Sequence, residues 1–179
     1  MIKKKDRRQK MNVQLNIQGR SQYSKDVNPQ FQNSACGPTT VFVILNYHGL
    51  QSSANTINEL YRQLGGTRIG LFKWQLIKNL RILLGSDWHV SSCTLSESLK
   101  ELEAGRPVAL KFDKHFTFRW FTKPTFKYHW VPLIGYEIED DELYLILHDN
   151  GGRNRESRIR KVRYADNHQV LSFVKIEPK

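Results

Sequence analysis

The chain has 179 residues, which fits one domain, and its 28 Lys and Arg outnumber its 17 Asp and Glu to give a formal charge of +11. Hydrophobic residues make up 39% and aromatic residues 11%, with only six prolines, which excludes a disordered, collagen-like or solenoid chain. The longest run of aliphatic or aromatic residues, at 41–45, is far below the roughly 18 that a membrane-spanning helix needs.

The first ten residues form a basic segment with six Lys or Arg and one Asp. No apolar stretch of roughly 7–15 residues follows it, so a secretory signal is not expected. Two cysteines, Cys36 and Cys93, are too few for a disulfide framework and fit free thiols in a cytoplasm. We therefore expect residues 1–12 to be a disordered basic arm and residues 13–179 to form a single cytoplasmic domain.

The expected elements change along the chain from helices to strands. An edge strand is expected at 12–18, and then a buried helix that opens with Cys36-Gly37-Pro38 and is apolar on all sides over 41–45. Helical spacing and a capping box at Thr94 predict further helices at 53–64, 71–84 and 94–105. Runs of β-branched and aromatic residues predict strands at 107–112, 115–121, 128–138, 143–148 and 170–176. Helices followed by strands indicate an α+β fold.

Cys36 is the strongest candidate for a reactive side chain. A cysteine attacks a carbonyl as the thiolate, and a helix N-terminus together with an imidazolium lowers a thiol pKa from about 8.5 to roughly 3.5–7.5. Cys36 lies where the buried helix begins, and its amide is a candidate oxyanion donor. Gln30 or Gln32 would supply a second donor. The alternative is a cysteine that acts as a small buried hydrophobe, which is our interpretation of Cys93.

A general base must come from elsewhere in the chain, and His129 begins the expected strand 128–138. If this strand pairs with the next one in a hairpin around the acidic turn 139–142, His129 lies near Asp149 or Asn150. Either residue would orient the imidazole, which is what nucleophile–base–orienter catalysis requires. Asp-Asn-Gly-Gly at 149–152 is also a strong turn signal, which gives a purely structural alternative.

The stretch Cys36-Gly37-Pro38-Thr39-Thr40, preceded by Gln30 or Gln32, resembles the cysteine peptidases that process double-glycine leaders and their stand-alone bacterial relatives. Segments 104–108 and 129–136, with Asp149 after the next strand, follow in the order of that family. The resemblance spans residues 30–152. It implies a papain-like fold, with the cysteine on a helical half and the histidine on a sheet half.

The same resemblance implies roles for individual residues. Cys36 would be the nucleophile, His129 the general base, Asp149 the orienter and Gln30 the oxyanion donor. The residues expected to contact the substrate are Gly37, Gln32, Trp130 and Asn150. The interval of 20 residues from His129 to Asp149 is longer than expected, which keeps Asn150 open as the orienter. No transporter domain accompanies the chain, so leader processing coupled to export is not expected.

Positive charge is concentrated at 106–127 and 151–163, each with six Lys or Arg against one acidic residue. Basic residues interleaved with aromatics, as in the first stretch, are typical of single-stranded nucleic-acid platforms, although residues 116–120 also have the period of a half-buried strand. A module that binds nucleic acid or another anionic polymer is therefore one alternative function. A catalytically silent peptide-binding protein of the same fold is another.

The sequence gives only weak signals for a cofactor or a metal. The glycine-rich segment 64–70 lacks the Lys followed by Ser or Thr that ends a phosphate-binding loop. Histidines and cysteines do not fall at paired metal-ligand spacings, so no metal or cofactor is expected. We favour a cysteine hydrolase that cleaves an amide bond of a peptide or protein through a thioester, and transfer of the acyl group to another acceptor would use the same residues.

Overall fold

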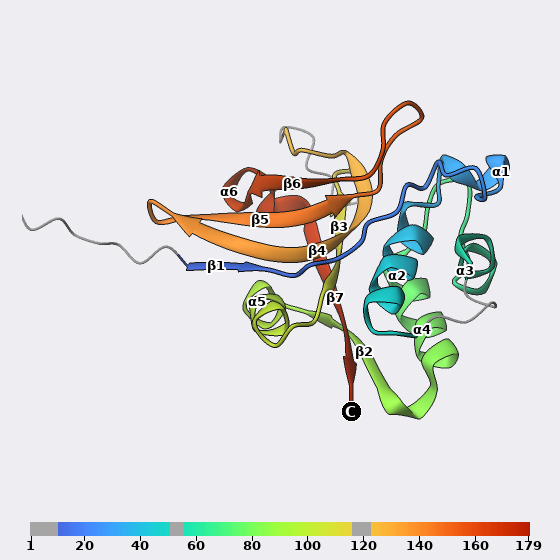
Figure 1. Cartoon of the computed structure of the whole chain (residues 1–179), viewed down its shortest axis with the longest axis horizontal. Helices are drawn as coiled ribbons and strands as arrows, with labels where there is room; N and C mark the ends of the chain where they lie inside the picture. Colours follow the sequence, from blue (N-terminus) through green and yellow to red (C-terminus); the bar gives the residue numbers. More distant parts are fainter. Residues whose placement is uncertain (1–10, 51–55, 116–122) are drawn as a thin grey trace, which may run out of the picture.

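The computed structural model describes residues 11–50, 56–115 and 123–179. A helical half lies beside a half built on a twisted sheet (Figure 1). The helical half consists of α1 (Pro29–Gln32), α2 (Cys36–Tyr47), α3 (Ile57–Gln63) and α4 (Lys73–Leu84). The predicted order of helices and then strands is confirmed, and with it the α+β class.

One seven-stranded antiparallel sheet has the order β2-β7-β3-β4-β5-β6, and β1 pairs with β4 off this path. The strands are β1 (Met11–Gln14), β2 (Trp88–Cys93), β3 (Val108–Asp113), β4 (Tyr128–Glu139), β5 (Glu142–Asp149), β6 (Arg158–Arg163) and β7 (Leu171–Pro178). The remaining helical elements are α5 (Leu95–Glu103), α6 (Tyr164–Asn167), η1 (Gly85–Asp87) and η2 (His168–Val170).

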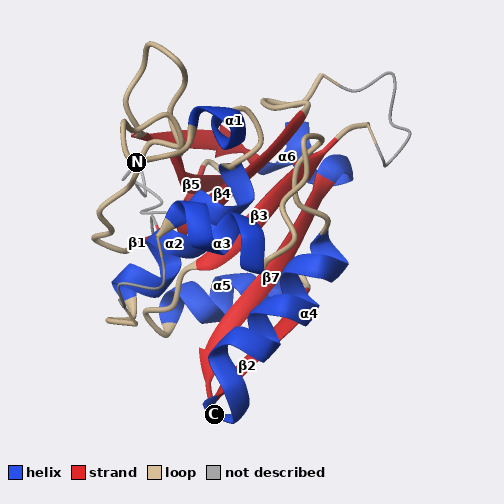
Figure 2. Ribbon diagram, turned by 90° about the vertical axis from the view of Figure 1, so that its right-hand side faces the viewer, coloured by secondary structure: helices blue, strands red, loops and turns tan. Residues whose placement is uncertain are grey.

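Apolar side chains cover both faces of the sheet. Toward the helical half, Ile44 of α2 and Leu76 of α4 belong to one buried cluster with Trp130 of β4 and Val174 of β7. Figure 2 shows these helices in front of the strands. On the other face, Leu102 of α5 packs in a second cluster with residues of β3, β4 and β5. The central helix α2 is therefore buried, as its all-round apolar sequence predicts.

Several element boundaries differ from the prediction. The first strand ends at Gln14, and β1 begins at Met11, inside the expected basic arm, whose residues 1–10 lie outside the described ranges. Residues 51–55 and 116–122, which include parts of an expected helix and an expected strand, also lie outside them. Strands β2 and β6 were not predicted, and β6 reads Arg-Ile-Arg-Lys-Val-Arg, with too few apolar residues to show the alternation of a half-buried strand.

Strands β4 and β5 form the predicted hairpin. Glu139 pairs with Glu142, and the two residues between them, Asp140 and Asp141, have φ values of 50° and 64°. Positive φ at both central residues is the type I′ geometry that matches the twist of paired strands. Because the chain folds back on itself here, the start of β4 and the end of β5 lie side by side.

Strand β1 lies directly against β4 because Gly135 has no side chain. A Cβ at this position would come within 2.1 Å of the Val13 carbonyl oxygen. From β1 the chain crosses to the helical half (Figure 1), and its residues 15–28 run past the start of α2. This crossing segment carries Gln22. The backbone N–H of Gln22 donates to the backbone carbonyl of Asn150 at 2.9 Å.

The side chain of Asn150, which is 1% exposed, joins the two halves. Its Nδ2 donates to the carbonyl oxygens of Cys36 at 3.0 Å and Trp130 at 2.9 Å, and to Oγ1 of Thr40 at 3.1 Å. The amide therefore ties the first turn of α2 to β4, so it fixes the position of Cys36 relative to the sheet.

We expect Asn150→Ala to lower the free energy of unfolding by about 3 kcal/mol, because three buried acceptors each lose a hydrogen bond. Urea unfolding followed by circular dichroism measures the change. Asn154→Ala, at an exposed position in the following loop, is the matched control. Equal unfolding midpoints for the two variants would show that the Asn150 amide does not hold the halves together.

Candidate active site

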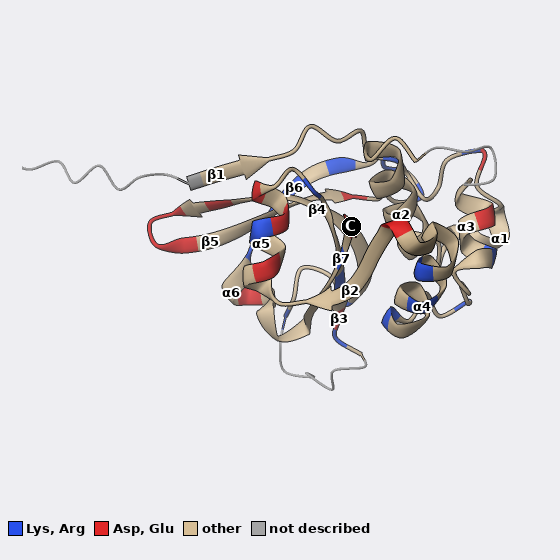
Figure 3. Ribbon diagram, turned by 90° about the horizontal axis from the view of Figure 1, so that it is seen from below, with Lys and Arg blue, Asp and Glu red and all other residues tan. Residues whose placement is uncertain are grey.

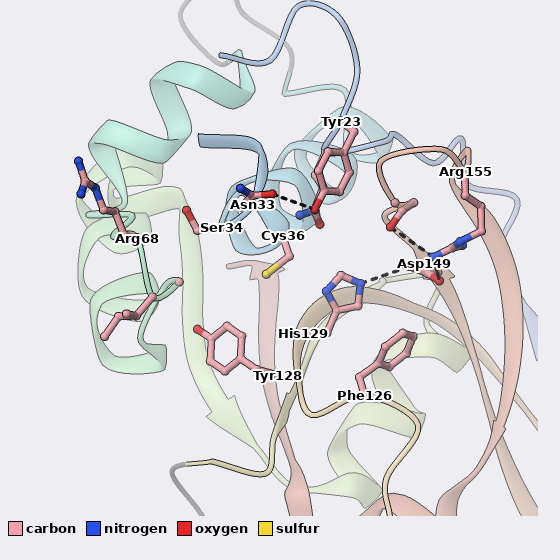
Figure 4. A pocket seen from close by; sticks show the side chains of 15 residues that line it. Tyr23, Asn33, Ser34, Cys36, Arg68, Phe126, Tyr128, His129, Asp149 and Arg155 are labelled. Atoms are coloured by element: carbon pink, nitrogen blue, oxygen red, sulfur yellow. Dashed lines mark hydrogen bonds and ion pairs between the residues drawn. The ribbon is translucent and has the colours of Figure 1, made fainter. Parts of the chain in front are cut away.

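Cys36 is the first residue of α2 and is 4% exposed. Amides in the first turn of a helix have no partner within the helix, so they give this end a partial positive charge. The carbonyl of Cys36 accepts from Oγ1 of Thr40 at 2.8 Å as well as from Asn150. The backbone that carries the sulfur is therefore held from two sides, and the thiol is in hydrogen-bond contact with His129. Figure 4 shows the two side chains next to each other.

The imidazole of His129 lies between Cys36 and Asp149 (Figure 4). Its Nε2 is 3.2 Å from Oδ1 of Asp149, which leaves Nδ1 on the side of the sulfur. His129 is at the second position of β4 and Asp149 is the last residue of β5, so the hairpin brings the two side chains together. Of the two candidate orienters, the structure places Asp149 and not Asn150 against the imidazole.

Cys36 and His129 shift each other's pKa toward the charged forms. Burial raises the pKa of the Cys36 thiol, but the hydrogen bond to His129, the charge of its imidazolium and the backbone hydrogen bonds to Trp130 and Gly37 together bring it below its usual value. Burial lowers the pKa of His129, whereas the hydrogen bonds to Asp149 and Cys36 raise it, and the result is a pKa of about 9. Their interaction therefore favours the thiolate–imidazolium pair over the neutral pair.

Two arginines also bind Asp149, whose side chain is fully buried. Nη2 of Arg155 is 2.8 Å from Oδ2 and Nη1 of Arg160 is 3.2 Å from the same oxygen. Burial raises the pKa of Asp149, but its bonds to His129 and Arg155 lower it to about 2. The Arg160 guanidinium also lies 5.1 Å from the ring centre of Phe126, which in turn packs against His129 at 4.8 Å.

Arg155 opposes the effect of Asp149 on His129, because it neutralises part of the carboxylate charge. We expect Arg155→Gln to move the alkaline limb of the pH–rate profile to higher pH, since Asp149 would then stabilise the imidazolium more strongly. The maximal rate should change by less than about tenfold. Lys78→Gln, on the exposed face of α4, is the control for loss of one positive charge. An alkaline limb that stays in place or moves down would show that Arg155 does not act on His129.

The predicted oxyanion donors, Gln30 and Gln32, do not line the pocket that contains Cys36. Gln30 is exposed on α1 and lines a neighbouring groove. Nε2 of Gln32 instead donates to backbone carbonyls of Ser24 and Val27, at 3.4 and 3.2 Å. The prediction relied on spacing to Cys36 and on the family resemblance. Both glutamines belong to α1, and neither side chain reaches the pocket.

Gln22, which the sequence analysis missed, lines this pocket and is 5% exposed. Its Nε2 donates to the Gln32 carbonyl at 2.7 Å, and its Oε1 has no partner among the described residues. A primary amide carries two N–H groups, so one is left for a ligand. No local pattern marks Gln22, because it reaches the pocket only through the crossing segment that follows β1.

Three residues expected to contact the substrate are buried structural residues. A Cβ at Gly37 would meet the Leu71 side chain at 2.9 Å, so the glycine serves packing rather than close approach of a substrate. Nε1 of Trp130 donates to the Leu71 carbonyl at 2.8 Å, and the side chain is fully buried. Asn150 is occupied by its three hydrogen bonds. None of the three lines the pocket.

The pocket has a volume of about 340 Å³ and lies between the two halves. Besides Cys36, His129 and Asp149, its lining includes Gln22, Tyr128 and Arg68. The Tyr128 hydroxyl donates to the Leu71 carbonyl at 3.0 Å, and burial raises its pKa. The lining near Arg68 also includes Ile69 and Gly70, so Tyr128 and Arg68 are its polar and charged side chains there.

Ion pairs occupy much of the basic stretch 151–163. Arg155 and Arg160 bind Asp149, Lys161 pairs with Glu137 at 3.0 Å and Glu139 at 2.8 Å, and Arg163 pairs with Glu142 at 2.6 Å. Figure 3 shows acidic residues at the tip of the β4–β5 hairpin. These pairs lower the charge that β6 offers to an anionic polymer.

Among the described residues, no group of three or more His, Cys, Asp or Glu side chains is arranged to hold a metal ion. Within the same ranges, none of the helices combines the length and the apolar character that a membrane span needs.

The sequence profile described as "Peptidase_C39 like family" matches residues 24–176. No curated protein matches the chain. Among solved structures, a C39-like peptidase from Bacillus anthracis superposes with a TM-score of 0.62 at 18% identity, covering 94% of this chain and 100% of that one. UfSP from C. elegans gives a TM-score of 0.60 at 11% identity, covering 94% of this chain and 34% of that one. These neighbours confirm the predicted papain-like fold.

Proposed function

The chain belongs to the Peptidase_C39 like family, and from that premise we propose that it hydrolyses a peptide bond through a thioester on Cys36. The observation that carries the proposal is the orientation of His129. Its Nε2 is bound to Asp149, so Nδ1 faces the sulfur of Cys36 and can exchange a proton with a substrate there.

In the first step the Cys36 thiolate attacks the carbonyl carbon of the scissile bond. The negative charge that develops on the carbonyl oxygen is stabilised by the Cys36 amide and by the second N–H of Gln22. The imidazolium of His129 then gives its Nδ1 proton to the leaving amine as the C–N bond breaks. This leaves a thioester on Cys36 and a neutral imidazole.

In the second step neutral His129 takes a proton from a water molecule, which attacks the thioester. The carboxylic acid product leaves, and the proton on Nδ1 restores the thiolate–imidazolium pair. Asp149 holds Nε2–H throughout, so the imidazole keeps one orientation and one tautomer. An acceptor other than water would give acyl transfer with the same residues. Membership of the peptidases that process double-glycine leaders stays a prediction, based on the sequence resemblance over residues 30–152.

Reactivity of the two cysteines tests the state of the nucleophile. At pH 7 we expect iodoacetamide to alkylate Cys36 about 100-fold faster than Cys93, because the pKa of Cys36 is lowered beside His129 whereas burial raises the pKa of Cys93. Peptide mass mapping locates the label in the native protein and in Cys36→Ala and Cys93→Ala. Alkylation that persists in Cys36→Ala and disappears in Cys93→Ala would contradict the proposal.

Cleavage is tested with a diverse peptide library in water enriched in ¹⁸O. A hydrolase places one ¹⁸O in each new carboxyl terminus, whereas transfer to an added amine does not. Cys36→Ala should produce no new termini. A native protein that is alkylated at Cys36 but cleaves and transfers nothing would support the catalytically silent alternative.

A further inference from the structure

A second groove opens beside the catalytic pocket, on the side of the helical half. Its volume is about 640 Å³, and Asn33, Ser34 and Arg68 line both it and the catalytic pocket. The two cavities are therefore neighbours, and a substrate bound at Cys36 that extends past these three residues enters the second groove.

The walls of the groove are held in place by side chains of α1 and α3. Phe31 stacks on Tyr61 with ring centres 4.1 Å apart and planes 5° from parallel, and the Arg62 guanidinium lies 5.5 Å from the centre of the Phe31 ring. The hydroxyls of Ser34 and Tyr61 are 2.9 Å apart. The groove is thus formed before a ligand arrives, which lowers the entropy cost of binding.

Among the residues that line this groove in the described part of the chain, Arg68 is the one that carries a charge. Arg68 is exposed in a turn that Thr67 and Gly70 close with reciprocal backbone hydrogen bonds of 3.0 and 2.9 Å. Within the described ranges its guanidinium has no ion pair, and the groove lining contains no Asp or Glu. Oδ1 of Asn33 accepts from Arg153 at 3.2 Å, which leaves the Asn33 Nδ2 as a further donor.

The chemistry at Cys36 decides which part of a substrate lies in the groove. The leaving amine must meet Nδ1 of His129, and Figure 4 shows Arg68 and Ser34 on the other side of the sulfur from His129. The portion that stays bound to the sulfur, the acyl portion, therefore extends toward Arg68.

We propose that this groove selects peptides with a glutamate or aspartate side chain in the acyl portion, bound by Arg68 and the Asn33 amide. The inference rests on the proposed peptidase function. A carboxylate matches the planar donor pair of a guanidinium, and such charge-assisted bonds are shorter and about twice as strong as neutral ones. A lysine or arginine in the same place would be repelled.

The experiment compares peptides that differ only by Glu, Gln or Lys at each acyl-side position. We expect kcat/KM for the best Glu peptide to exceed that for its Gln partner by about fivefold or more, with the ratio falling as salt rises. Arg68→Glu should reverse the order so that Lys peptides are preferred. Lys100→Glu makes the same charge change at an exposed position of α5, on the sheet half, and should leave the order as in the native protein.

Binding to Cys36→Ala, measured by fluorescence polarisation with the same peptides, gives a readout that does not need turnover. Equal affinity for Glu and Gln peptides, or the same preference in Arg68→Glu as in the native protein, would overturn the inference even where peptides are cleaved. Acidic peptides that bind through Arg68 but are never cleaved would support the groove and count against the peptidase function.

Discussion

Cys36→Ala, His129→Ala and the double variant are expected to lose the same factor in kcat/KM, about 10⁴ or more. Side chains that act as one unit do not contribute independently, so the second substitution should cost little once the first is made. The activity that is left in all three comes from binding and the oxyanion donors.

The reason for equal losses is that Cys36 and His129 depend on each other for their charges. Burial alone raises the pKa of the Cys36 thiol, and the bond to His129 turns this into a net lowering. Without the imidazole, Cys36 is a neutral thiol and the leaving amine has no proton donor. Without the sulfur, His129 has no thioester to hydrolyse.

The absorbance of the thiolate near 240 nm separates the two roles of His129. In His129→Ala the titration of Cys36 should move to higher pH than in the native protein. His89→Ala, on β2, should change neither the titration nor the rate. A thiolate that forms at the native pH in His129→Ala would show that the helix terminus alone ionises Cys36.

A site residue could be predicted where residues close to it in the sequence determine its position. Cys36 at a helix start follows from Cys-Gly-Pro and the apolar run behind it. His129 and Asp149 follow from a hairpin whose two-residue turn sets the register of both strands. In each case a short stretch of sequence carries the geometry.

The parts that were missed depend on contacts between distant segments. Gln22 reaches the pocket because β1 packs against Gly135, far along the chain. Gly37 and Trp130 are occupied by Leu71, a residue between α3 and α4, and spacing around Cys36 carries no information about it. The arginines of the 151–163 stretch suggested a polyanion surface, yet two of them bind a buried carboxylate on the neighbouring strand.

Asp149→Asn is expected to lower kcat/KM by about 10³-fold, although the new side chain has almost the same shape. If the side-chain oxygen of the asparagine faces Nε2 of His129, the side-chain NH2 group faces the guanidinium groups of Arg155 and Arg160. If the amide is turned, an N–H faces Nε2, and the imidazole must carry its proton on Nδ1 and cannot pair as an imidazolium with Cys36. The first arrangement opposes donors at the arginines, and the second holds His129 neutral in the wrong tautomer.

The same carboxylate gives the stability of the fold a pH dependence. The pKa of Asp149 is about 2 in the folded state, below the roughly 3.9 of an unfolded chain, so its stabilising effect is complete above about pH 4 and is lost as pH falls through 2. Asp149→Asn removes this dependence, so urea midpoints of the native protein and the variant should approach each other as the pH falls below 4.

Removing the arginines distinguishes loss of charge from loss of geometry. With Arg155→Gln and Arg160→Gln added, the introduced asparagine could present its oxygen to His129 without a clash, so Asp149→Asn should cost only about tenfold in that background. The comparison measures kcat/KM for one peptide in four proteins. They are the native protein, Asp149→Asn, the variant with Arg155→Gln and Arg160→Gln, and the variant with all three substitutions. An unchanged 10³-fold loss in the arginine-free background would mean that the negative charge of Asp149 itself, and not the arrangement of donors around it, sustains the imidazolium of His129.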